Sequence, residues 1–290
     1  MKKLKFLALC AMAAGVVTSC QKDEITNDEQ PVSLELSKDL QDKIWATGVN
    51  PGNATIEKIT LLNGIEEEYV LSGDIMMKLS EIEKGSYDLE DSEDGVNKQY
   101  RTNNLVSTAN RTIDILGYTG SGNALTSNMQ TGLQWAVNNY NRISTTLNFR
   151  LTFGTNFQAA DMVVYNNNGS GAGGQAEFPE GGRPGKFIQI LNGTGTFGGS
   201  NVNNVNEHVI GHEIGHALGF RHTDYARRRC DNSNEGTAGS IGAINIPGTP
   251  TANQWGQSGL DSGSLMISCF DGSEDGEFSS FDIVALEYLY

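Results

Sequence analysis

The feature that most constrains the fold is the confinement of all four histidines to fifteen residues, 208–222. His212 and His216 are four residues apart, and such residues lie one above the other on one face of an α-helix, so both imidazoles can reach a single ion. Gly219 can adopt the left-handed conformation that ends a helix and reverses the chain. His222 can then turn back toward the same ion. The spacing therefore predicts a metal site at the end of a helix, with His212, His216 and His222 as its ligands.

Glu213 is the residue that we expect to act together with the metal in catalysis. It follows His212 by one position, about 100° around the helix, so its carboxylate lies beside the ion rather than on it. Three protein ligands leave one coordination position open, which is typical of a catalytic rather than a structural zinc site. Zinc lowers the pKa of a bound water from 15.7 to about 7. We therefore expect one Zn²⁺ and hydrolysis through a metal-activated water, with Glu213 as general base.

The extended pattern HExxHxxGxxH resembles the metzincin clan of zinc peptidases, and residues 212–216, HEIGH, are similar to the bacterial dual-action HEIGH metallopeptidase family. Residues 264–266 resemble the clan's Met-turn. Residues 278–286 resemble the C-terminal helix of the HEIGH family, and residues 70–75 resemble part of that family's N-terminal region. The resemblance implies a zinc endopeptidase with the same three ligands and base. It places Met266 as a hydrophobic floor below the metal, whereas on sequence alone Met266 reads as core packing. No tyrosine closely follows Met266, so the resemblance does not extend to the tyrosine that assists some members.

The order of predicted elements indicates an α+β fold with a mixed sheet. Alternation and helical spacing predict one strand, a long helix, three strands and then the motif helix; the ranges before the motif helix are 112–118, 127–143, 147–153, 161–165 and 186–191. The resemblance implies a metzincin-like zincin catalytic domain over 101–290, with a twisted mixed sheet and two long helices. It also implies that an extended substrate adds to an edge strand, for which 187–191 is the candidate. Residues 166–185 are rich in Gly and Asn and are expected to form a surface loop.

A small N-terminal domain is expected over residues 37–100. A short helix around residues 40–44 precedes strand-like runs at 56–62 and 68–77, and an acidic linker covers 88–97. This region is either a propeptide or a spacer. Because this region contains no cysteine, it cannot inhibit the enzyme through a thiolate bound to the zinc. An acidic side chain could bind the zinc instead, although the sequence singles out none.

The first 36 residues are expected to be an export signal and a tether. Lysines 2, 3 and 5 precede an apolar stretch of twelve residues, too short to span a bilayer and typical of a secretory signal. Residues 17–20, VTSC, resemble a bacterial lipobox with Cys20 as the lipidated residue, and residues 21–24, QKDE, resemble the export tag of Bacteroidetes surface lipoproteins. We expect a signal peptide over 1–19, a lipidated tether over 20–36 and a lipid-anchored protein at the outer membrane or cell surface of a Gram-negative bacterium. An ordinary cleaved signal with an incidental cysteine is the alternative.

Charge and cysteine content limit the partners. The net charge of −15 argues against a nucleic-acid partner, which favours a basic face. Protein or peptide substrates are expected, with membrane contact through the N-terminal lipid only. The protein is expected to be a monomer.

Cys230 and Cys269 are the two cysteines left in the exported body, and a disulfide between them is expected in an oxidising setting. Two free buried thiols are the alternative.

Three weaker candidates remain. Asp224 is interpreted either as a hydrogen-bond acceptor for a ligand imidazole or as a solvated loop acid. His208 is expected at the start of the motif helix rather than on its metal side. Residues 271–282 resemble an EF-hand loop, which would bind Ca²⁺, although Ser279 and Asp282 also match a helix capping box.

The same residues allow two other functions, a zinc amidase or a non-catalytic surface-binding lipoprotein on a metzincin scaffold. The presence of Glu213 argues against the second.

Overall fold

The computed structural model describes residues 36–290 except 63, 88–99, 103 and 237–242. The signal segment 1–19, Cys20, nearly all of the tether and the linker 88–97 lie outside the described residues. The described residues all belong to one compact unit. Among the described residues, no helix has both the length and the apolar content needed to cross a bilayer.

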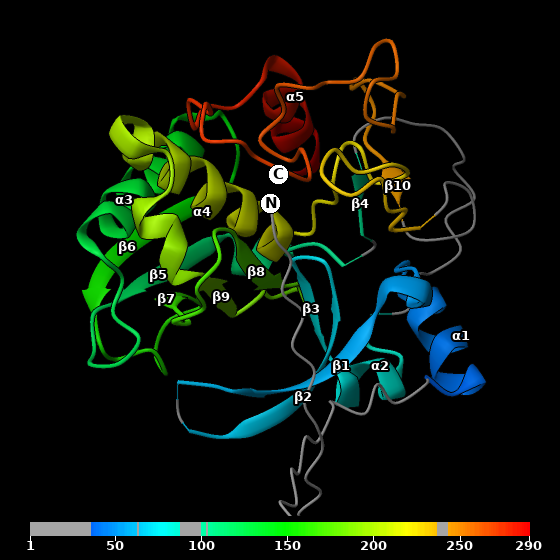
Figure 1. The fold of residues 1–290 in the computed structure, drawn as a ribbon, viewed down its shortest axis with the longest axis horizontal. Helices are drawn as coiled ribbons and strands as arrows, with labels where there is room; N and C mark the ends of the chain where they lie inside the picture. Colours follow the sequence, from blue (N-terminus) through cyan, green and yellow to red (C-terminus); the bar gives the residue numbers. More distant parts are fainter. Residues whose placement is uncertain (1–35, 63, 88–99, 103, 237–242) are drawn as a thin grey trace, which may run out of the picture. The chain divides into compact units, whose positions relative to one another are not determined.

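One eight-stranded mixed sheet forms the centre of this unit (Figure 1). Its strand order is β1-β2-β3-β8-β9-β7-β5-β6. The strands are β1 (Thr55–Thr60), β2 (Glu66–Ser72), β3 (Ile75–Lys78), β5 (Thr112–Tyr118), β6 (Asn148–Gly154), β7 (Met162–Asn166), β8 (Gly174–Glu177) and β9 (Phe187–Ile190). Strands β6, β5, β7 and β9 are parallel, whereas β8 runs antiparallel to β9 and parallel to β3. A separate two-stranded sheet pairs β4 (Tyr100–Arg101) with β10 (Ile244–Asn245).

The α+β expectation is confirmed, including the two long helices. Helix α3 (Ser127–Arg142) begins where Thr126 accepts a hydrogen bond from the Met129 amide, and α4 (Val202–Leu218) carries the histidine motif. The shorter helices are α1 (Lys38–Ala46), α2 (Leu79–Lys84) and α5 (Ser280–Leu289), with short 3₁₀ turns at Pro51–Asn53, Thr108–Asn110, Asn192–Thr196 and Gly199–Asn201.

Helices α3 and α4 pack closely side by side, and this contact fixes the position of the motif (Figure 1). A Cβ added at Gly132 of α3 would lie 2.6 Å from the carbonyl carbon of Asn206 in α4, so only glycine allows this approach. The buried hydroxyl of Tyr140 donates to the carbonyl oxygen of Gly211, at 2.8 Å. The two helices share one hydrophobic core with the parallel strands. Ile113 and Ile115 of β5 and Ile214 of α4 are buried in this core.

Three expectations about strands need correction. The run predicted as one strand over 68–77 is a hairpin, because Gly73 takes a φ of +66° and reverses the chain between β2 and β3. The loop expected over 166–185 contains β8. The candidate edge strand 187–191 corresponds to β9, which has β7 on one side and β8 on the other and is therefore not an edge.

The sheet and core continue across the boundary expected after residue 100. Strand β3 pairs with β8, Ile75 opposite Ala176. One buried cluster joins Tyr69 and Met76 of the hairpin with Val163 and Phe187 of the strands beyond residue 100. The hairpin is thus packed as part of the same sheet as the strands around the motif.

Candidate metal centre

The motif helix ends as the glycine spacing predicts. Gly219 caps α4 in the left-handed conformation, φ +105°. A Cβ there would lie 2.6 Å from the carbonyl oxygen of Asn104, so a larger residue would meet both strain and a clash. The chain then reverses, and His222 returns to the imidazoles of His212 and His216. All three histidines are buried.

The three imidazoles converge through their Nε2 atoms. His222 Nε2 lies 3.0 Å from His212 Nε2 and 3.2 Å from His216 Nε2. Each Nδ1 atom meets an oxygen acceptor: Leu265 O at 2.7 Å from His212, Phe220 O at 2.8 Å from His216, and Glu235 Oε1 at 2.5 Å from His222. Because each Nδ1–H donates to its acceptor, the Nε2 lone pairs are directed at one common point. Three imidazole nitrogens arranged in this way suit a zinc ion.

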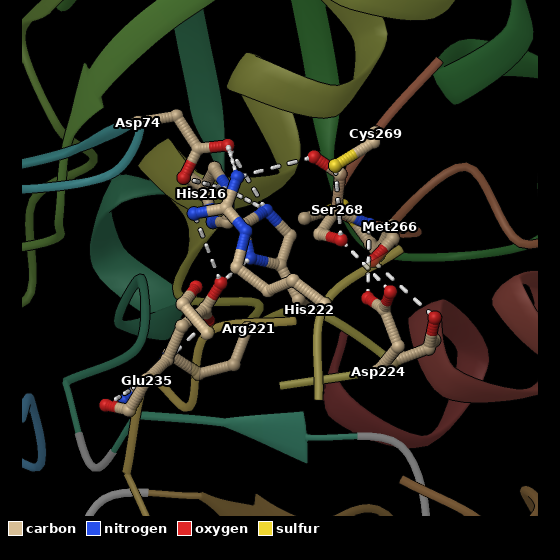
Figure 2. Close-up of polar contacts among 12 residues, drawn as sticks. Asp74, His216, Arg221, His222, Asp224, Glu235, Met266, Ser268 and Cys269 are labelled. Carbon is tan, nitrogen blue, oxygen red and sulfur yellow. Dashed lines mark hydrogen bonds and ion pairs between the residues drawn. The ribbon is translucent and has the colours of Figure 1, made fainter. Parts of the chain in front are cut away.

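Glu235 is the acceptor for His222 that the sequence did not identify. Its carboxylate is buried and also lies 3.4 Å from Arg228 Nη1 and 3.7 Å from Arg221 Nη2 (Figure 2). Burial alone would lower the pKa of His222, but the carboxylates of Asp74 and Glu235 raise it to about 10. The same electrostatic attraction would favour a metal cation at Nε2.

Asp74 is the second residue that the sequence missed. It lies in the β2–β3 turn, and its carboxylate is directed at the histidines (Figure 2). Asp74 Oδ2 lies 3.1 Å from His222 Nε2 and 3.7 Å from His212 Nε2, and Oδ1 lies 3.7 Å from His216 Nε2. Burial would raise the pKa of Asp74, but His222 and the other two imidazoles hold it well below its usual range. Among the described residues, these four side chains form a group whose ligand atoms lie within 4.8 Å of one another.

Glu213 lies beside the imidazoles with one oxygen unused. Its Oε2 atom is buried and has no hydrogen-bond partner in the described part of the chain. Burial, and next the charge of Asp74, raise the pKa of Glu213 well above its usual value. A Cβ at Gly174, the first residue of β8, would lie 2.6 Å from Glu213 Cγ. Gly174 therefore makes room for this carboxylate.

The turn that carries Met266 supports the motif helix from below. Met266 is buried, and a Cβ added at Gly215 would lie 2.4 Å from its sulfur, so Gly215 of the motif allows the contact. Asp282 of α5 holds this turn by accepting from Ser264 Oγ at 2.6 Å and from the Leu265 amide at 2.7 Å. The structure thus places Met266 against the helix that carries the histidines.

Asp224 has neither of its expected roles. It is fully buried, and its carboxylate accepts from the amide of Ser268 at 3.0 Å, from Ser268 Oγ at 2.8 Å and from the Arg229 amide at 2.8 Å (Figure 2). It therefore ties the segment after His222 to the segment after Met266. The expected disulfide between Cys230 and Cys269 is present and joins the same two segments, with Cα atoms 5.8 Å apart.

A cavity of about 540 Å³ opens next to the imidazoles. Its charged lining residues are Glu213, Arg228 and Asp74. Its apolar lining includes Leu191, Phe197, Val209, Ile267 and Phe270, together with Cys230 and Cys269. His208 also lines this cavity, 6.3 Å from His212 between ring centroids, and lies inside α4 rather than at its start as expected. Burial lowers the pKa of His208 to about 3, so its ring is neutral.

The capping-box interpretation of Ser279 and Asp282 is confirmed at the start of α5. Both oxygens of Asp282 accept hydrogen bonds, and Asp271 accepts from Ser273 and Arg229. The calcium expectation for residues 271–282 stays a prediction.

Comparison with known proteins identifies a family and similar solved structures. A family model described as the dual-action HEIGH metallo-peptidase matches residues 69–290. Two solved structures of myroilysin are similar at 15% and 16% identity. Each similarity covers 60% of this chain. It covers 78% and 81% of the two myroilysin chains, with TM-scores of 0.35 and 0.34. No curated protein matches in sequence.

Proposed function

The chain belongs to the dual-action HEIGH metallo-peptidase family, and from this premise we propose that it is a zinc-dependent endopeptidase that cuts proteins or peptides. The observation that carries the proposal is the convergence of three imidazole Nε2 atoms, each with its Nδ1 held by an acceptor, beside the unpartnered carboxylate oxygen of Glu213. His212, His216 and His222 would hold the ion.

When bound, the metal supplies Lewis acidity, which polarises the peptide carbonyl and makes a water molecule more acidic. Glu213 would take a proton from that water at Oε2, and the support for this role is that Oε2 is buried and unpartnered in the described part of the chain and that Glu213 lines the cavity. Glu213 would later give the proton to the leaving amine. The apolar residues that line the cavity, among them Leu191, Phe197 and Phe270, would accept a side chain of the substrate.

The assay is casein cleavage by the purified full chain, tested intact and after limited trypsin digestion that is stopped with a serine-protease inhibitor. Cleavage should be abolished by a zinc chelator, restored by Zn²⁺, and reduced at least about a thousandfold by Glu213→Gln. Glu287→Gln, an exposed change on α5, serves as the matched control and should leave the rate unchanged. Chelator-resistant cleavage, or full activity of Glu213→Gln, would refute the proposal. Hydrolysis of small amides without cleavage of any protein would instead support the amidase alternative.

We also propose that the protein is exported and anchored by lipid at Cys20, on the resemblance of residues 17–20 to a lipobox. Cys20→Ala should then release the protein from the membrane fraction. Unchanged fractionation of this variant would count against the anchor.

A further inference from the structure

We propose that Arg228 is a further catalytic residue, whose guanidinium binds the negatively charged oxygen that develops on the substrate during peptide hydrolysis. This inference rests on the peptidase function proposed above and names a residue of the same site. In the sequence this role has no candidate, because no tyrosine closely follows Met266. None of the described residues that line the cavity is a tyrosine or a lysine, and Arg228 is the one among them with a permanent positive charge.

Arg228 reaches the cavity from the segment that follows the third histidine. Its side chain is 11% exposed and lines the cavity together with His212 and Glu213. Its Nη2 atom lies 3.9 Å from Asp74 Oδ2, and this oxygen lies 3.1 Å from His222 Nε2. A negatively charged oxygen in front of the imidazoles is therefore within reach of the guanidinium. A substrate oxygen that took the same position would lie between the metal ligands and Arg228.

Most of the hydrogen-bond donors of this guanidinium are unused. In the described part of the chain, the Arg228 side chain makes one hydrogen bond, from Nη2 to the carbonyl oxygen of Ser268 at 3.4 Å. Its Nε atom is buried and has no hydrogen-bond partner there. The nearby carboxylates lie at ion-pair distances, with Glu235 Oε1 3.4 Å from Nη1 and Asp231 Oδ1 4.0 Å from Nε. Because an arginine side chain has five N–H donors, it can bind an additional oxygen without losing these contacts.

The charge and the position of Arg228 are both maintained by its surroundings. Burial would lower the pKa of this guanidinium, but the carboxylates of Asp74 and Glu235 raise it above its usual value. The Arg228 amide donates to the carbonyl oxygen of Ser233, at 3.0 Å, and the disulfide of Cys230 lies two residues further along the chain. The segment is thus fixed before a substrate binds. Donors that are fixed in advance stabilise a charge that develops in the transition state with little cost of reorganisation.

The step at which Arg228 acts is the addition of water to the peptide carbonyl group. The water oxygen bonds to the carbonyl carbon, one proton of the water passes to Glu213, and the π electron pair moves to the carbonyl oxygen, which becomes negatively charged. The guanidinium donates to this charged oxygen more strongly than to the neutral carbonyl. The C=O bond then re-forms, the C–N bond breaks, and Glu213 gives its proton to the amine nitrogen. Because the charged state gains most, Arg228 should act mainly on kcat.

A purely structural role would make Arg228 only a counter-charge for the buried carboxylate of Glu235. That carboxylate already has a second cation beside it, since Arg221 Nη2 lies 3.7 Å from Glu235 Oε2 and the Arg221 side chain is fully buried. A counter-charge also needs no contact with the cavity, whereas Arg228 lines it. These two observations favour a role toward the substrate.

The first experiment measures anion binding without any peptide cleavage. The full chain is loaded with Co²⁺ and titrated with dimethylphosphinate, a tetrahedral anion with two oxygens, and separately with imidazole, a neutral metal ligand, while the visible spectrum is followed. Arg228→Gln should lower the ratio of phosphinate affinity to imidazole affinity at least about tenfold. Arg228→Lys keeps the charge on a single ammonium group, so its ratio should lie between the other two. Arg227→Gln, which changes an exposed arginine outside the cavity lining, is the matched control and should behave as the unmodified chain.

An equal affinity ratio in Arg228→Gln and in the unmodified chain would overturn the inference. A structural role alone would weaken both ligands together, and the ratio would then stay constant. If Arg228→Gln does not fold, as judged by circular dichroism, or does not hold Co²⁺, the Arg228→Lys variant decides in the same way. Failure of both variants to fold or to hold Co²⁺ would also overturn the inference, because the arginine would then be structural.

The second experiment separates an effect on kcat from an effect on KM. Both constants are measured with fluorescently labelled casein, using the preparation that is active in the casein assay. Arg228→Gln should lower kcat about 100- to 1,000-fold while KM changes by less than about threefold, and Arg228→Lys should restore part of kcat. A loss confined to KM would overturn the inference. If the unmodified chain cleaves no casein, the proposed function fails, whereas the affinity ratio needs no catalysis and still tests the contact of Arg228 with the anion.

Discussion

Removal of the Glu235 carboxylate should weaken metal binding and the fold by separable amounts. Glu235 Oε1 lies 2.5 Å from His222 Nδ1, and the carboxylate also lies within 4 Å of Arg221 and Arg228. Loss of such a partner of a ligand imidazole typically costs 10- to 100-fold in metal affinity, which is about 1.4–2.7 kcal/mol. Glu235→Gln keeps an acceptor for Nδ1 but loses the charge, so we expect about a tenfold loss of zinc affinity. Glu235→Ala loses both, so we expect about a hundredfold loss.

Glu235→Ala should also destabilise the chain without metal. It removes the buried negative charge next to two guanidinium groups, and removing one partner of a buried ion pair costs about 3–5 kcal/mol. Zinc affinity is measured by competition with a chromophoric chelator at pH 7.5, and stability by urea unfolding in excess EDTA. Glu287→Gln is the control for both measurements. If Glu235→Ala is folded and binds zinc as tightly as the unmodified chain, the role assigned to this carboxylate is wrong.

Three further predictions concern packing and charge. Burial raises the pKa of Glu207 from 4.5 to about 7, so the folded state binds this proton more tightly than the unfolded state, and stability is lost as pH rises from about 4.5 to about 7. At pH 8.5, Glu207→Gln should therefore be more stable than the unmodified chain by about 1–2 kcal/mol and should melt at a higher temperature. The difference in stability should be much smaller at pH 5.5. A difference that does not change with pH would contradict this. Gly215→Ala would place a Cβ 2.4 Å from the Met266 sulfur and should cost about 1–3 kcal/mol in urea unfolding. It should cost clearly less in a Met266→Ala background, and additive costs would argue against the contact. Reduction of the Cys230–Cys269 disulfide, which closes a loop of 39 residues, should lower stability by about 3–4 kcal/mol, and an unchanged melting temperature in reductant would refute this estimate.

The sequence predicts well what local spacing determines. The four-residue period of His212 and His216 requires a helix, and Gly219 marks its end, because both depend on backbone geometry within a few residues. The same holds for α3 and for the capping box at Ser279. The C-terminal helix is expected from the family resemblance of residues 278–286, and the disulfide from the expectation of an oxidising setting.

The rest depends on contacts between distant segments. Asp74 meets His222 across 148 positions of sequence, and nothing in the spacing of an acidic N-terminal region distinguishes this aspartate from its neighbours. The tight turn signal Ser72-Gly73-Asp74 was present, but the apolar runs on both sides resemble one continuous strand. Glu235 lies 13 residues after His222 in an irregular stretch, where periodicity gives no register. Strand β8 is hidden because glycine and asparagine dominate its surroundings, and its pairing with β9 and β3 overrides weak local propensity.

The most direct test of the account is the metal content and ligand set of the purified full chain. Elemental analysis should find one zinc per chain, and X-ray absorption at the zinc edge should show imidazole ligands. His212→Ala should lose the metal, whereas His208→Ala, four residues earlier on the same helix, should keep it. A correctly folded chain without any bound divalent transition metal, or one that retains its zinc in His212→Ala but loses it in His208→Ala, would contradict the account.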